Sequence, residues 1–444
     1  MSNPQSPLQL WGGLECTINR VGNTFFDQDL ISGHRERLAS DLECVATLGI
    51  RTLRTGLHWE TFASTQSWQV FDERLAVMRR LRIEPIAGLL HHGSGPNTPA
   101  ISTDLLDPQF PEKLAAYALE VARRYPSILS YTPINEPQTT GRFACLYGHW
   151  FPHHRSLPSY IRALYHQIRG IVLAMRAIRS VQPEARLVHT EDGGVTYSTP
   201  QLESFRVERE HRRWIGTDLL CGLVTREHAL FPFLLENGLS ESEILWFSEN
   251  ACPPSVLGLN YYVTSDRFLD HRLHLYPPHL SGGDSGSEPL VDTEAVRVHP
   301  GGIAGAGAVL AEAWNRYRLP VAVTEAHLGC HSDEQLRWLA EVWRQAQEAR
   351  SAGADVRAVT VWAILGSYNW CHLCTRDTGA YEPGAFDVSS GTPVATPLAN
   401  LVRDLTAGRP LSHPDLSQPG WWHHADRFIP ELYSEELSGD LIGA

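Results

Sequence analysis

The sequence lacks several features, and each absence narrows the range of functions. The 444 residues carry a formal net charge of −13, so neither nucleic acid nor an anionic membrane is an expected partner. No stretch approaches 18 uncharged apolar residues, and so no transmembrane helix is expected. Residues 1–10 have no basic start and no apolar core, which argues against a secretory signal. The eight cysteines are therefore expected to be reduced thiols in a cytoplasmic protein.

Motifs for metals and cofactors are also scarce. Cys371 and Cys374 form a single C-x-x-C, with Cys330-His331 elsewhere, whereas a structural zinc site needs four ligands. The glycines at 301–307 lack the strand–turn–helix context of a phosphate-binding loop. We expect no metal and no cofactor. Lysine is nearly absent as well, because Lys113 is the only one, and we interpret this as compositional bias.

Short apolar runs alternate with longer helical patterns, which predicts parallel βα units. Eight runs have strand character: 8–15, 50–57, 84–91, 131–136, 186–191, 256–263, 320–325 and 356–364. Helices are expected at 34–48, 72–81, 111–125, 159–181, 218–230 and 303–317, and a capping box of Ser332 and Gln335 is expected to open another. The predicted fold is α/β: one (β/α)8 TIM barrel over residues 1–408, with the tail 409–444 packing on it.

Residues 264–300 stand apart from this alternation. They are rich in His, Pro, Gly and Ser, and we expect no regular structure there. A connection this long is more often functional than accidental. It has the length to build a cleft for a large leaving group.

Two of the predicted strands end in a glutamate. The run 131–136 leads into Asn135-Glu136-Pro137, and a proline favours an extended conformation in the residue before it. We therefore expect Asn135 and Glu136 at an extended strand tip. The run 320–325 ends in Glu325 in the same way. In a (β/α)8 barrel these strand ends meet at one face, and two carboxyl groups there are what glycoside hydrolysis needs.

Other polar and aromatic residues are predicted at the same strand ends. Amides, histidines and carboxylates can bind sugar hydroxyls, and tryptophan rings can stack on sugar faces. Any single one of these residues is more simply read as a satisfied buried group, whereas the two glutamates in a barrel context favour catalysis. The residues are Glu15, Arg54, His58, His91, His92, Asn135, Glu191, Asn260, Tyr262, Trp362, Tyr368, Asn369 and Trp370.

The ordered motifs resemble those of glycoside hydrolase family 1, the β-glucosidase-like barrel glycosidases. Residues 83–92 resemble the strand-three segment with its sugar-binding histidine, and 132–137 resemble the acid/base motif. Residues 257–262 match the strand-six Asn-Tyr-Tyr, 323–325 the nucleophile motif, and 361–370 the aromatic segment of strand eight.

This resemblance implies a retaining β-glycosidase that hydrolyses a small-molecule glycoside or oligosaccharide. Glu325 would be the nucleophile and Glu136 the acid/base. The implied orienting residues of the nucleophile are Arg54, Tyr262 and Asn260. The implied substrate-binding residues are His91, Asn135, Trp362, Asn369, Trp370 and Glu15.

Three departures from the family pattern concern the sugar site. Ala326-His327 replaces Asn-Gly after the nucleophile, and Gly93 follows His92 where the family has aspartate. Asn369 replaces the glutamate that grips two sugar hydroxyls. The glycone is therefore expected not to be plain glucose. The alternatives are a transglycosylating enzyme of the same fold and a catalytically silent sugar-binding protein. Oligomeric state cannot be read from the sequence.

Overall fold

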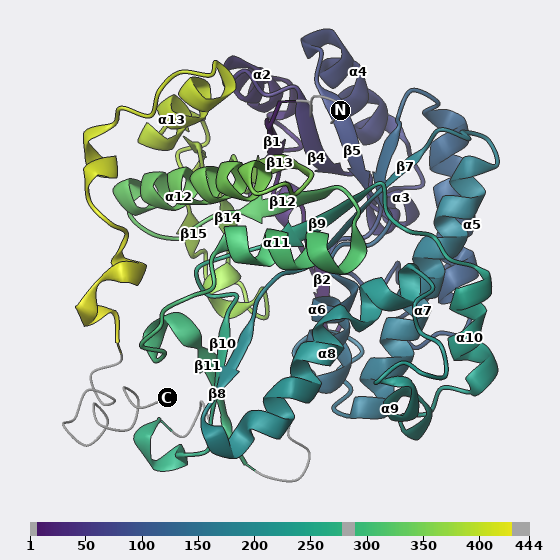
Figure 1. The fold of residues 1–444 in the computed structure, drawn as a ribbon. Helices are drawn as coiled ribbons and strands as arrows, with labels where there is room; N and C mark the ends of the chain where they lie inside the picture. Colours follow the sequence, from purple (N-terminus) through teal and green to yellow (C-terminus); the bar gives the residue numbers. More distant parts are fainter. Residues whose placement is uncertain (1–6, 278–288, 429–444) are drawn as a thin grey trace.

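Eight parallel strands close into a barrel in the computed structural model, which describes residues 7–277 and 289–428 (Figure 1). The order around the barrel is β1-β13-β12-β9-β7-β6-β5-β4. The prediction of a (β/α)8 barrel is confirmed. The strands are β1 (Gln9–Gly13), β4 (Thr52–Gly56), β5 (Glu84–Gly88), β6 (Ser130–Thr132), β7 (Arg186–Asp192), β9 (Val256–Asn260), β12 (Val321–Ala326) and β13 (Val356–Val361).

Amphipathic helices surround the barrel. In α5, for example, Leu114, Ala118 and Val121 recur at helical spacing and are fully buried. The barrel interior is filled by side chains from five strands, among them Trp11, Ile86 and Val188. The main surrounding helices are α2 (Leu38–Thr47), α4 (Gln69–Leu81), α5 (Phe110–Arg124), α7 (Leu157–Arg179), α8 (Glu203–Leu220), α11 (Ala306–Tyr317), α12 (Ser332–Ser351) and α13 (Pro397–Thr406).

Two local predictions about helices are wrong. The helix expected at 218–230 lies at α8, and it ends before Gly222, whose φ of +72° is left-handed. The inward face of α8 includes buried arginines, so the apolar periodicity does not mark it. The capping box at Ser332 is absent, because His331 is the N-cap residue of α12. The Gln335 amide donates instead to the Leu328 and Pro383 carbonyls.

The segment 264–300, predicted to lack regular structure, contains part of a sheet. β10 (Arg267–Asp270) pairs antiparallel with β11 (Val291–Glu294) and parallel with β8 (Thr196–Ser198). Phe268 and Val291 form a small apolar cluster beneath it. The strands are only four residues long, so the composition of the flanking residues hides them. Residues 278–288 of this segment lie outside the described residues.

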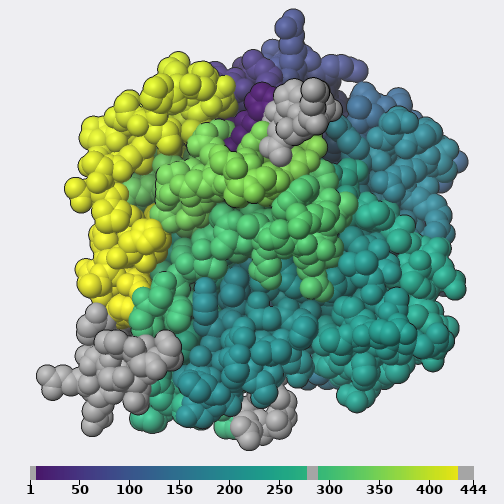
Figure 2. Space-filling view, in the orientation of Figure 1, coloured from purple at the N-terminus to yellow at the C-terminus, as the bar shows by residue number. Residues whose placement is uncertain are grey.

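The C-terminal part of the described chain runs along one flank of the molecule, as the yellow surface in Figure 2 shows. Trp422 is buried there, edge-on to Trp338 of α12 at 5.3 Å, and its indole donates to Glu341. The predicted tail 409–444 thus contacts α12 through its first half, and residues 429–444 lie outside the described residues. Among the described helices, none has both the length and the apolarity needed to cross a bilayer.

Candidate active site

The segment after β6 places Asn135 and Glu136 between two neighbouring strands. Asn135 forms parallel bridges to His91 and to Thr190, beyond the end of β6. Glu136 does not adopt the predicted extended conformation, because its φ of 43° and ψ of 63° are left-handed. Pro137 opens the short helix α6 (Pro137–Gly141), a position that proline favours. A left-handed non-glycine residue costs on the order of 1–3 kcal/mol, a strain often found at functional sites.

Glu325 lies at the end of β12 and has two strong partners. The Arg54 guanidinium donates to its Oε1 at 2.9 Å, and the Tyr262 hydroxyl donates to its Oε2 at 2.5 Å. The side chain is almost completely buried. Burial raises the pKa of Glu325 to about 7, while Arg54 and Tyr262 oppose this rise by favouring the charged form. The carboxylate is therefore held in one orientation by a cation and a phenol.

Glu136 is equally buried, but its surroundings differ. Its Oε1 accepts from the neutral Asn260 amide at 2.7 Å, and the His92 ring lies 3.8 Å from Oε2. Burial lowers the pKa of His92 to about 3, so the ring is neutral. Burial, followed by the charge of Glu325, raises the pKa of Glu136 well above its ordinary value. The surroundings of Glu136 therefore favour its protonated form, whereas Arg54 and Tyr262 favour the charged form of Glu325.

The structure corrects the predicted role of Asn260. The sequence predicted that Asn260 orients Glu325, the implied nucleophile. In the structure its amide donates to Glu136, and its Oδ1 accepts from the Thr324 hydroxyl at 2.7 Å. β9 lies directly beside β12, and the pairing registers shift between Val323 and Glu325. Asn260 therefore joins Glu136 to Thr324, the residue that precedes Glu325.

Four predicted sugar-binding residues belong to one buried network. His91 stacks on Trp362 with ring centroids 5.4 Å apart, and its Nε2 lies 3.0 Å from the Asn135 amide. The Trp362 indole donates to Glu15 at 3.0 Å, and Arg54 lies over the Trp362 ring. Burial lowers the pKa of His91 well below its ordinary value, so the ring is neutral. These side chains fix one another before any substrate arrives.

Asn369 is placed near this site, but its side chain is engaged within its own loop. Its Nδ2 donates to Asp377 at 3.0 Å, and its Oδ1 accepts from the Thr378 backbone and hydroxyl. The Asn369 amide is therefore not free for the predicted contact with sugar hydroxyls, because it stabilises a turn in its own loop. Trp370 lies edge-on to His92 at 5.7 Å, and within the described chain its buried indole N–H has no hydrogen-bond partner.

Sequence reasoning missed Asn19. It lies on β2 (Ile18–Val21), fully buried, and its Nδ2 donates to the Cys374 carbonyl at 3.0 Å. Its Oδ1 is buried, with no hydrogen-bond partner among the described residues. A buried acceptor left unpaired costs free energy, which indicates a waiting partner. Asn19 stands between Ile18 and Arg20 in a mixed segment, so no sequence pattern singled it out. The described residues contain no group of three or more His, Cys, Asp or Glu arranged to hold a metal ion.

Comparisons with known proteins point to one group of enzymes. No protein-family model matches the chain. Phospho-cellobiase of Klebsiella oxytoca is 22% identical over 404 residues, covering 81% of this chain and 82% of that protein. Beta-galactosidase of Saccharolobus solfataricus is 23% identical over 273 residues, covering 58% of this chain and 52% of that protein.

Solved structures agree with the curated relatives. Beta-glucosidase from Thermotoga maritima in complex with cyclophellitol superposes with a TM-score of 0.70 at 15% identity, covering 86% of this chain and 88% of that one. The structure of the family 1 β-glucosidase from that organism gives a TM-score of 0.68 at 15% identity over the same shares. These relatives and neighbours are glycoside hydrolases. The resemblance to family 1 glycosidases that the motifs indicated is thus confirmed, and the barrel fold is shared with them.

Proposed function

We propose that the chain is a β-glycosidase that cleaves its substrate by double displacement with retention of anomeric configuration. The observation that carries the proposal is the contrast between the two glutamates. Glu325 is bound by a guanidinium and a phenol, whereas Glu136 is bound by a neutral amide. A retaining glycosidase needs one ionised carboxylate and one protonated carboxyl group side by side. The glycoside hydrolases among the relatives support the same reaction class.

In the first step, the ionised Glu325 attacks the anomeric carbon and displaces the leaving group. Glu136 donates its proton to the departing oxygen, so the leaving group departs as a neutral alcohol. The bond formed is an ester between the sugar and Glu325. Arg54 and Tyr262 stabilise Glu325 before attack, and Arg54 also donates to Asn135 Oδ1 at 2.9 Å.

In the second step, water releases the sugar. Esterification removes the negative charge of Glu325, which had been raising the pKa of Glu136. The pKa of Glu136 therefore falls, and the same carboxylate can accept a proton from the attacking water. Asn135 is held from two sides, because its Oδ1 also accepts from the Thr190 hydroxyl at 2.8 Å. This position suits a contact to the sugar hydroxyl next to the anomeric carbon, which strengthens in the transition state.

We propose a sugar that does not need a carboxylate to bind the hydroxyls far from its anomeric carbon. The Asn369 amide is used by its own turn, so it supplies no charge that needs a pair of hydroxyls. A site without such a charge loses less when a hydroxyl is missing. We therefore propose 6-deoxy or otherwise modified β-glycosides as substrates.

The test is a screen of 4-nitrophenyl β-glycosides of glucose, 6-deoxy sugars and uronic acids, followed by proton NMR during early turnover. The β-anomer is expected as the first product. The α-anomer first would show inversion and overturn the mechanism. Binding without turnover on every glycoside would favour the silent sugar-binding protein. Added methanol distinguishes hydrolysis from transglycosylation, since a transferase converts it into a methyl glycoside.

A further inference from the structure

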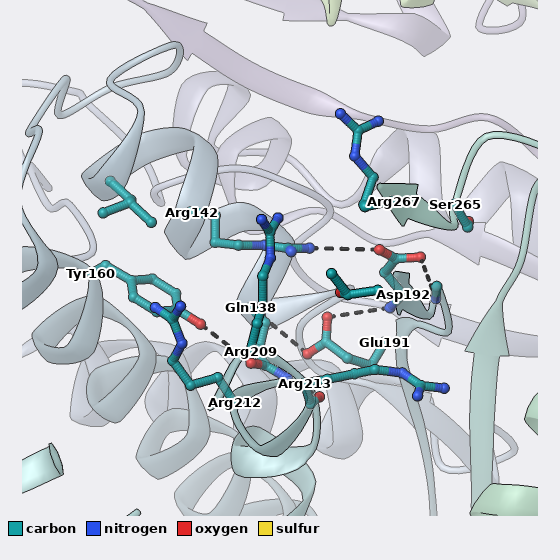
Figure 3. Close-up of a pocket in the computed structure, with 13 residues that line it drawn as sticks. Gln138, Arg142, Tyr160, Glu191, Asp192, Arg209, Arg212, Arg213, Ser265 and Arg267 are labelled. Atoms are coloured by element: carbon teal, nitrogen blue, oxygen red, sulfur yellow. Dashed lines mark hydrogen bonds and ion pairs between the residues drawn. The ribbon is translucent and has the colours of Figure 1, made fainter. Parts of the chain in front are cut away.

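A pocket rich in arginine lies beside the segment that carries Glu136 (Figure 3). It is formed by the segment after β6, the end of β7, and elements α7, α8, β8 and β10. The free volume is about 50 Å³. One water needs roughly 10–15 Å³ on such a measure, so the space suits a small polar group rather than a sugar ring. The arginines that line it are Arg142, Arg209, Arg212, Arg213 and Arg267.

The charge of this lining contrasts with the acidic chain as a whole. Only two acidic side chains line the pocket, Glu191 and Asp192. Burial raises the pKa of Glu191 to about 8, so this carboxyl group is neutral at pH 7. The other carboxylates that pair with the arginines are not lining residues, as with Asp292, which binds both Arg209 and Arg267. The lining itself therefore holds more positive than negative side chains, and such a lining favours an anion.

Arg142 has a donor group that is available to a ligand. Its nearest carboxylate, Asp192, is 3.6 Å away, beyond hydrogen-bond distance, and one Nη donates to the Thr139 hydroxyl at 3.1 Å. Its Nε is buried and makes no hydrogen bond to any part of the chain that the structure describes. Figure 3 shows Arg142 extending across the pocket toward Asp192. An anion seated here would satisfy a buried donor that the protein leaves open.

The pocket lies next to Glu136, the proposed proton donor to the leaving group. Gln138 lies two residues after Glu136, and its backbone N–H donates to Glu191 at 3.1 Å. The charge of Asp192 is near enough to raise the pKa of Glu136, after burial and the charge of Glu325. Because Glu136 protonates the departing oxygen in the proposed reaction, the space beyond it belongs to the leaving group.

We propose that this pocket binds an anionic group, a carboxylate or a phosphate, carried by the leaving-group half of the substrate. The proposal rests on the proposed glycosidase function for the position of the leaving group. It makes the substrate class a β-glycoside with an acidic aglycone. Guanidinium groups suit both anions, because their N–H fork matches carboxylate and phosphate geometry.

The kinetic test compares three aryl β-glycosides of the best glycone from the screen. The phenol carries a 4-carboxylate, a 4-phosphate ester or a neutral 4-carboxamide. For the wild type, kcat/KM with one anionic leaving group is expected to exceed that with the carboxamide by about tenfold. The anionic leaving group with the higher kcat/KM shows whether the pocket prefers a carboxylate or a phosphate. Raising the salt concentration to about 0.5 M should shrink the preference by screening.

The matched variants are Arg142→Gln, Arg267→Gln and Arg206→Gln. Arg206 lies on the same helix as three pocket arginines but outside the lining, where it pairs with Glu203. Arg142→Gln should lower the anion-to-carboxamide ratio about fivefold or more, and Arg206→Gln should leave it unchanged. Arg267→Gln, on the opposite wall, serves if Arg142→Gln does not fold. A ratio near one in the wild type, or one unmoved by the pocket variants, means that the arginines only hold α8 to its neighbours and overturns the proposal.

Calorimetry separates this proposal from the proposed function. Free 4-hydroxybenzoate, 4-hydroxyphenyl phosphate and 4-hydroxybenzamide are titrated into the wild type and Arg142→Gln. Anion binding that weakens in Arg142→Gln supports the pocket even if no glycoside is cleaved. Equal binding of anions and amide overturns the pocket even if the chain proves to be a glycosidase.

Discussion

Glu325 and Glu136 are both buried at strand ends of the same barrel, yet their partners differ. Arg54 and Tyr262 hold Glu325, and the pKa of Glu325 rises only to about 7 despite burial. Glu136 has the Asn260 amide as its hydrogen-bond partner and feels the charge of Glu325, so its pKa rises well above the ordinary value. The difference teaches that one cation and one phenol are enough to give two like carboxyl groups different pKa values, as the proposed nucleophile and acid require.

The largest expected effect comes from removing Glu325, the proposed nucleophile. Glu325→Gly should lower turnover by about 10³-fold or more, about 4 kcal/mol at the transition state. The fold should persist, because the side chain lies at a strand tip. Added azide should restore turnover on a β-glycoside and give the α-glycosyl azide, identified by NMR. Melting curves check the fold, and turnover within about tenfold of wild type without azide would exclude Glu325 as nucleophile.

The next effect depends on the leaving group. Glu136→Ala should slow alkyl β-glycosides by about 10²–10⁴-fold, because their alkoxide needs a proton to depart. Dinitrophenyl glycosides, with an acidic leaving group, should lose far less in the glycosylation step. The measurement is kcat/KM across a series of leaving groups of rising acidity. Equal losses along the series would assign Glu136 to binding.

A third buried carboxyl group sharpens the comparison. Glu60 in α3 (Trp59–Thr65) has no side-chain partner among the described residues, and burial raises its pKa to about 8 from 4.5. Folding therefore takes up a proton between pH 4.5 and 8, and wild-type stability falls as pH rises through this window. Glu60→Gln should add roughly 1–3 kcal/mol at pH 7.5 and nothing near pH 4.

Urea unfolding at several pH values measures this gain. Glu73→Gln, on the exposed face of α4, is the matched control and should show no such pH dependence. A gain for Glu60→Gln that is equal at pH 4 and pH 7.5 would mean that packing, rather than protonation, explains the effect.

The smallest effect tests the Tyr262 hydroxyl. Its hydrogen bond lowers the pKa of Glu325, so Tyr262→Phe should move the acid limb of the kcat/KM profile to higher pH. Activity at pH 6 should drop about three- to tenfold relative to the optimum, compared with wild type. Tyr165→Phe in α7 is the control. An acid limb that stays in place would remove Tyr262 from the control of Glu325.

Local sequence patterns determined most of the barrel and both glutamates. Apolar runs bounded by turn residues mark strands directly, because a strand buried on both faces leaves no polar alternation. The Asn-Glu-Pro run and the glutamate at the end of β12 were found by the same logic, since the strand ends of this fold carry its chemistry. Short strands such as β10 and β11 were not predicted, because four residues give too little sequence signal.

Tertiary structure alone decided which polar groups meet. The Arg54–Glu325 pair joins residues 271 positions apart. The family resemblance implied this contact, but nothing in the local pattern of either segment specifies the distance. The Asn369 amide is used by a turn, and Asn260 is bound to Glu136 rather than Glu325. Arg209 and Arg212 of α8 are buried, and no local pattern in the sequence indicates this. Hydrogen bonds and ion pairs depend on positions within an ångström, whereas hydrophobic patterning depends only on which face is covered.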